Sequence, residues 1–93
     1  MEFKYNNTFF ENGKYYTKVP SVFRNNVYAN LDKAGIEYET FGLDDEIEEL
    51  CAKHDMSDYA FYWGRPFKSH FTMFFVTKVP IEEIVTNSRW RYR

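Results

Sequence analysis

Aromatic residues interspersed with polar ones along residues 3–19 indicate two β-strands, and Asn12-Gly13 stands between the two halves. Both residues of this dipeptide tolerate the positive φ angles of a type I′ turn, so we expect a β-hairpin closed at this point. The turn then sets the cross-strand pairs, which are Glu11 with Lys14, Phe10 with Tyr15, and Phe9 with Tyr16.

Two later segments carry apolar residues at helical spacing. The first opens at Pro20-Ser21, where Ser21 is the expected N-cap, and stops before Gly35, the expected left-handed residue after the helix. The second, residues 43–54, has Asp44 as N-cap and further acids in its first turns, where the helix dipole favours them. The apolar stripes are Phe23, Val27, Leu31 and Ala34 in the first helix, and Leu43, Ile47, Leu50 and Cys51 in the second.

The remaining elements are strands and one short helix. Residues 36–41 alternate and predict a strand, and residues 59–63 and 69–78 predict a second hairpin closed by residues 64–68. The last strand is apolar on both faces, so we expect it at the centre of the sheet or covered on both sides. A short helix over residues 81–85 and a polar, basic tail follow.

This order, ββαβαββα, predicts one α+β domain over residues 1–93, with residues 86–93 as its tail. We expect an antiparallel sheet of about five strands with two or three helices mainly on one face. Aromatic residues make up 22% of the chain, which exceeds the need of a core this small, so some should be exposed on a binding face.

The net charge of −2 hides a strong asymmetry along the chain. Residues 1–31 carry a net +2, residues 32–58 a net −8 and residues 59–93 a net +4. The acidic middle suggests a negative surface that steers a protein partner with a basic surface, although the same residues also fit a solvated helix face. The candidate protein-binding residues are Glu37, Glu39, Asp44, Asp45, Glu48, Glu49 and Asp55.

The basic end of the chain supports an alternative, the binding of RNA or single-stranded DNA. The tail alternates arginine with aromatic residues, and the 59–68 hairpin adds aromatic and basic residues, a combination that contacts phosphates and stacks on bases. The tail also fits docking on the chain's own acidic surface, or a frayed end. The candidate nucleic-acid-binding residues are Trp63, Arg65, Lys68, Arg89, Trp90 and Arg91. A second alternative is a structural homodimer.

The sequence offers little catalytic chemistry. Cys51 and His54 share one side of a helix, but no second pair with metal-ligand spacing accompanies them. His70-Phe71-Thr72 resembles one copy of the His-x-Thr motif of two-histidine phosphoesterases, which need two copies, and the second is missing. We therefore expect no enzyme, no cofactor and no metal.

Cys51 is the sole cysteine, which argues against a small secreted domain held by disulfides. Charged and amide residues occur throughout residues 1–19, and no apolar run is long enough for a membrane helix, so we expect a cytoplasmic protein. The abundance of residues with AT-rich codons is consistent with an AT-rich genome, such as that of a phage or a low-GC bacterium. The predicted function is that of a non-enzymatic protein-binding module, a small inhibitor or adaptor acting on a host or defence protein.

Overall fold

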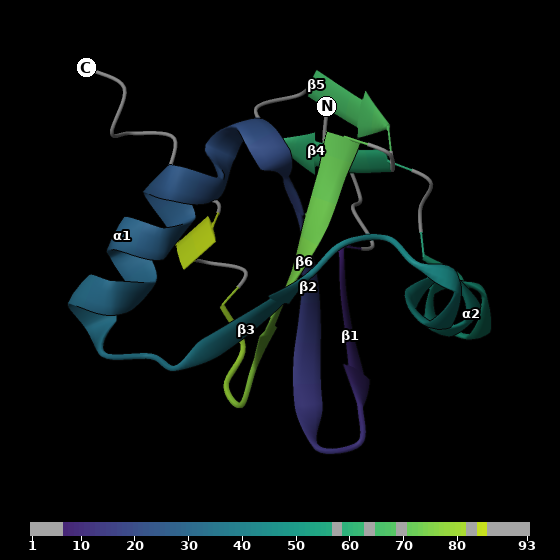
Figure 1. Ribbon diagram of the computed structural model, residues 1–93, viewed down its shortest axis with the longest axis horizontal. Coiled ribbons are helices and arrows are strands. Elements are labelled where there is room, and N and C mark those ends of the chain that lie inside the picture. Colours follow the sequence, from purple (N-terminus) through teal and green to yellow (C-terminus); the bar gives the residue numbers. More distant parts are fainter. Residues whose placement is uncertain (1–6, 57–58, 63–64, 69–70, 82–83, 86–93) are drawn as a thin grey trace, which may run out of the picture.

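The computed structural model describes residues 7–56, 59–62, 65–68, 71–81 and 84–85. Four strands form one antiparallel sheet in the order β1-β2-β6-β3 (Figure 1). Their bounds are β1 (Thr8–Glu11), β2 (Lys14–Pro20), β3 (Tyr38–Phe41) and β6 (Thr72–Thr77). A separate antiparallel pair joins β4 (Tyr59–Tyr62) and β5 (Arg65–Lys68), and the helices are η1 (Ser21–Phe23), α1 (Arg24–Ala34) and α2 (Asp45–Lys53). The α+β class with an antiparallel sheet is thus confirmed.

The first hairpin has the predicted register. Asn12 and Gly13 have φ angles of 54° and 79°, as a type I′ turn requires. The three predicted pairs are all present, and the rings of Phe9 and Tyr16 stack with their centroids 4.8 Å apart.

Strand β6 lies at the centre of the sheet, between β2 and β3, as its two apolar faces indicate. Phe74 and Phe75 are adjacent and fully buried, but they belong to different hydrophobic clusters because successive side chains point to opposite faces. Phe75 packs in a cluster with Val27 and Leu31 of α1, whereas Phe74 packs with Ile47 of α2.

The two helices therefore cover opposite faces of the sheet, and Figure 1 shows α1 and α2 on opposite sides of the strands. The expectation that the helices lie mainly on one face is wrong. The physical reason is that β6 carries large apolar side chains on both faces, so each face needs its own helix to exclude water.

The predicted second hairpin is also wrong. β4 pairs with β5, which occupies residues expected to be the closing loop, and β6 pairs with β2 and β3 instead. Both edges of β6 are taken by these neighbours, so none remains for β4. Ala60 and Phe67 of the small hairpin join the hydrophobic cluster on the α1 side, where the rings of Phe67 and Phe23 meet edge to face.

The helix ends agree with the sequence at two of the three predicted positions. The side chain of Ser21 does not cap a helix, because Ser21 starts the 3₁₀ turn η1 and α1 begins only at Arg24. Gly35, with a φ of 72°, ends α1 as predicted, and the amides of Gly35 and Ile36 donate to the carbonyls of Asp32 and Leu31. Asp44 caps α2, since its Oδ1 accepts a hydrogen bond of 2.9 Å from the amide of Ile47.

α2 ends in a similar way, although the left-handed residue is not a glycine. Asp55 has a φ of 55°, and the amides of Asp55 and Met56 donate to the carbonyls of Ala52 and Cys51. Further along the chain, Val85 donates its amide to the carbonyl of Ile81, as in a single helical turn. Within the described residues, no helix has the length and apolar character that crossing a bilayer needs.

Candidate protein-binding surface

The acids of α2 point into solvent because the other side of the helix is apolar. Ile47, Leu50 and Cys51 pack against the cluster of Phe9 and Phe74, which turns the acidic positions outward. The exposed carboxylates, here called the α2 acids, belong to Asp44, Asp45, Glu46, Glu48 and Glu49. Among the residues that the structure describes, none of the α2 acids forms an ion pair, so their charge is not neutralised locally.

Glu37 and Glu39 lie apart from the α2 acids, at the start of β3. They line an open hollow of about 550 Å³, together with Asp32. Lys14 and Lys78 line the same hollow, so its charge is mixed. The predicted acidic surface therefore consists of two groups of carboxylates on different elements, a strongly acidic one on α2 and a mixed one beside β3.

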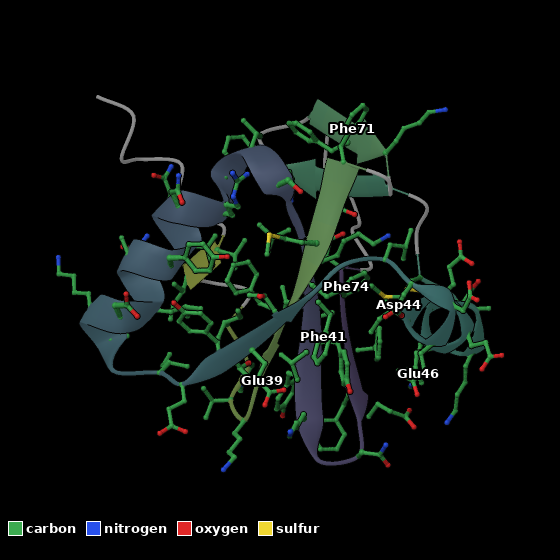
Figure 2. All side chains as sticks on the ribbon, in the orientation of Figure 1. Glu39, Phe41, Asp44, Glu46, Phe71 and Phe74 are labelled. Atoms are coloured by element: carbon green, nitrogen blue, oxygen red, sulfur yellow. The ribbon has the colours of Figure 1, made fainter. Side chains whose placement is uncertain are left out.

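An exposed aromatic ring separates the two groups. Figure 2 shows Glu39 and Phe41 on β3, with Asp44 and Glu46 on α2 on the far side of Phe41. The side chain of Phe41 is 40% exposed, although its cross-strand partner Phe74 is fully buried. Phe41 is not among the residues that the sequence pattern marks as candidates, yet the alternation of Glu37, Glu39 and Phe41 in the strand expected over residues 36–41 predicts all three on one face.

The exposed position of Asp55 has a local structural explanation, because this residue forms the left-handed end of α2. Asp55 stands at the opposite end of the helix from Asp44. We therefore do not group it with the α2 acids.

The C-terminal end of α2 is held against the first hairpin by contacts of Lys53 and His54 with the largely buried carboxylate of Glu11. The carboxylate of Glu11, whose side chain is 15% exposed, lies 2.8 Å from Nε2 of His54 and 3.2 Å from Nζ of Lys53. The hydrogen bond with His54, followed by that with Lys53, holds the pKa of Glu11 below its ordinary value. The His54 ring stacks on Phe9 with centroids 4.6 Å apart, so His54 fixes α2 on β1.

This arrangement gives Cys51 and His54 separate surroundings. His54 faces Glu11 and Phe9, whereas Cys51 packs among apolar residues and burial raises the pKa of its thiol. A raised pKa leaves less of the thiolate, which is the nucleophilic form. Within the described residues, no three His, Cys, Asp or Glu side chains are grouped closely enough to hold a metal ion.

Most of the predicted nucleic-acid-binding residues cannot be placed. Trp63, Arg89, Trp90 and Arg91 lie outside the described residues, as does His70 of the His-x-Thr motif. For Arg65 only the backbone is described, in β5, and Lys68 ends the same strand with an exposed side chain.

Several large apolar side chains are exposed, in line with the surplus of aromatics in the sequence. Phe10, next to the hairpin turn, and Phe71, just before β6, are 54% and 59% exposed. They stand at opposite ends of the sheet: Phe10 faces Tyr15 near the turn, and Phe71 immediately precedes Thr72, which pairs with Pro20 at the other end of β2. Phe10 shares a face with its partner Tyr15 and with Thr77, which is the opposite face from Phe74 and its partner Phe41, so Phe10 does not extend the Phe41 surface.

Comparison of the chain with protein-family models, curated proteins and solved structures found no match.

Proposed function

We propose that this protein is a non-enzymatic protein-binding module, of the inhibitor or adaptor type, that docks a basic protein through the α2 acids. The observation that carries the proposal is the outward face of α2, where five carboxylates are exposed and without ion pairs in the described part of the chain. Clustered charges of one sign attract an oppositely charged surface and raise the association rate.

Surface charge raises the association rate more than the affinity, so a docking surface also needs an apolar side chain that becomes buried in the complex. Phe41 supplies one, because it lies between the two acidic groups and exposes 40% of its side chain. An aromatic side chain buries on the order of 150–250 Å² when it is fully covered. In this surface the α2 acids would raise the association rate, and burial of Phe41 would supply affinity.

The test is an affinity pull-down of the tagged full chain from its own cells, read by mass spectrometry with and without nuclease. The variant reverses two of the α2 acids, Glu48→Lys and Glu49→Lys, whose side chains are exposed. A matched control introduces two lysines at exposed positions of α1, Asn25→Lys and Ala29→Lys, on the other face of the sheet.

The proposal expects a partner that survives nuclease treatment, is recovered by the control and is lost with the double reversal. Its capture should also weaken as salt rises, because exposed charges are screened over about 8–10 Å at physiological ionic strength. Recovery that is equal for the reversal and the control would remove the α2 acids from the function. Recovery that collapses with nuclease would favour nucleic acid instead.

A further inference from the structure

We infer that the open edge of β3 accepts an extended basic segment of the partner as an additional antiparallel strand. The inference rests on the proposed function and names the second contact that the partner makes. β3 is an edge strand, with β6 as its only sheet neighbour among the described residues (Figure 1). Every second residue of an edge strand directs its backbone N–H and C=O groups away from the sheet, which is a template for another strand.

The side chains of β3 indicate what such a strand must carry. Glu39 and Phe41 share one face of β3, Glu37 immediately precedes the strand at the next position of the same alternation, and all three are exposed. In an antiparallel pair, directly opposite residues have Cβ atoms about 4.5–5.5 Å apart. An incoming strand therefore needs an apolar residue opposite Phe41, a basic residue two positions later opposite Glu39, and a second one opposite Glu37.

The two lysines in the neighbouring hollow do not cancel this preference. Lys78 follows β6 and Lys14 begins β2, so they lie one and two strands further from the open edge than Glu39 does. Strands are about 4.8 Å apart, so the backbone of an incoming strand would lie roughly 10 Å from the backbone of β6 and roughly 14 Å from that of β2. By this backbone spacing, Glu39 is nearer to an incoming strand than Lys78 and Lys14 are.

The same charges disfavour a second copy of this chain at this edge. Two β3 strands paired with each other would bring the Glu37 and Glu39 side chains of both copies together, and like charges on facing strands are destabilising. The edge is thus protected against self-pairing but open to a cationic strand.

The test titrates the full chain into a fluorescent peptide, Thr-Phe-Thr-Lys-Thr-Lys-Thr, and follows anisotropy. An isomer, Thr-Phe-Lys-Thr-Lys-Thr-Thr, has the same composition but places the lysines on the opposite face from the phenylalanine, and it should bind several-fold more weakly. Glu39→Gln should also weaken binding of the first peptide several-fold, whereas Asp55→Asn, an exposed position at the C-terminal end of α2 that is not one of the α2 acids, should not.

Two further peptides test the strand pairing itself. One carries N-methyl groups on the inner threonines, the other on the phenylalanine and the lysines. Since only alternate amides face β3, one of the two should lose about tenfold in affinity and the other should bind as before. Two methylated peptides that both bind like the unmodified one would overturn the edge pairing. That result would leave the proposed function standing, because the pull-down with the α2 reversal tests it separately.

Discussion

Nε2 of His54 lies 2.8 Å from Oε1 of Glu11, which joins the end of α2 to the end of β1 across 43 positions of sequence. Lys53 adds a second contact to the same carboxylate, at 3.2 Å. Glu11 also faces Lys14 across the hairpin turn, so the turn, the first strand pair and the helix meet at one side chain. This position holds α2 against the sheet at the end away from its N-cap.

The ion pair predicts a pH dependence of stability. The folded-state pKa of Glu11 is lowered from 4.5, with the hydrogen bond to His54 as the largest cause. A carboxyl with a lowered pKa contributes stability above its unfolded pKa and loses it as the pH falls through the lower, folded value. We expect the advantage of the wild type over Glu11→Gln, measured by urea unfolding, to shrink as the pH falls below 4.5 and through the lower, folded pKa. A difference between the wild type and Glu11→Gln that stays constant over this pH range would contradict the prediction.

The N-cap of α2 predicts a specific loss on substitution. Asp44→Ala removes the acceptor of the Ile47 amide and should lower the free energy of unfolding by about 1 kcal/mol. For a domain of this size the melting temperature should fall by roughly 4–8 °C per kcal/mol. Asp44→Asn keeps the cap and should stay close to wild type in the same thermal scan. A loss as large for asparagine as for alanine would show that charge, and not the cap, stabilises this end.

The two faces of the sheet should respond independently to changes in packing. Ile47 is buried on the α2 side and Ile81 on the α1 side, in separate clusters. Ile47→Val and Ile81→Val should each cost about 0.5–1.5 kcal/mol by denaturant unfolding. The double variant should lose the sum to within about 0.5 kcal/mol, because the two sites share no partners. A clear departure from the sum would mean that the faces are coupled through β6.

Two glycines form a matched pair for testing backbone strain. Gly35 has a φ of 72°, a conformation that costs a residue with a Cβ roughly 1 kcal/mol or more, so Gly35→Ala should destabilise by about that amount. Gly42 has no positive φ, and an added Cβ would meet no atom within 4 Å. Gly42→Ala should therefore be neutral or stabilising by up to about 1 kcal/mol. Thermal denaturation of both variants gives the comparison, and equal losses would refute the backbone explanation.

Features set by neighbouring residues could be predicted from the sequence. The turn at Asn12-Gly13 fixes the hairpin register through local backbone preferences, and Asp44 and Gly35 mark helix ends through local hydrogen bonds. Ser21 failed as an N-cap because the 3₁₀ turn η1 stands in front of α1, and this turn satisfies part of the helix end by other means. The backbone N–H of Arg24, the first residue of α1, donates to the carbonyl of Ser21.

Features set by distant pairing could not be predicted in the same way. The apolar faces of β6 show that it needs neighbours on both edges, but they do not say which strands these are. Residues 64–68 contain glycine and proline and were interpreted as a loop, yet most of them form β5, where Pro66 is tolerated in a two-stranded ribbon. The burial of Lys18 is another feature that the local sequence does not predict. Lys18 is 1% exposed in β2, and its Nζ lies 5.9 Å from the centroid of the Phe74 ring on β6.

The sequence predicts which acidic residues form the candidate site, but not that they lie in two separate groups on α2 and beside β3. The outward position of Asp45 and Glu48 follows from the helical period of α2. The distance between Glu39 and that helix depends on how α2 packs across the sheet, which no local pattern encodes. The exposure of Phe41 likewise follows from β3 being an edge strand, a property of the whole sheet.

The central place of β6 has a consequence for how the chain folds during synthesis. β6 is the last of the described strands to leave the ribosome, yet it joins β2 to β3 and gives both helices their packing surface. Until residue 77 has emerged, the first hairpin and β3 have no common partner, and the helices lack the β6 side chains in their clusters, Phe75 for α1 and Phe74 for α2. Folding of the sheet must therefore follow translation of most of the chain, and a fragment that stops before β6 should expose apolar surface to chaperones and proteases.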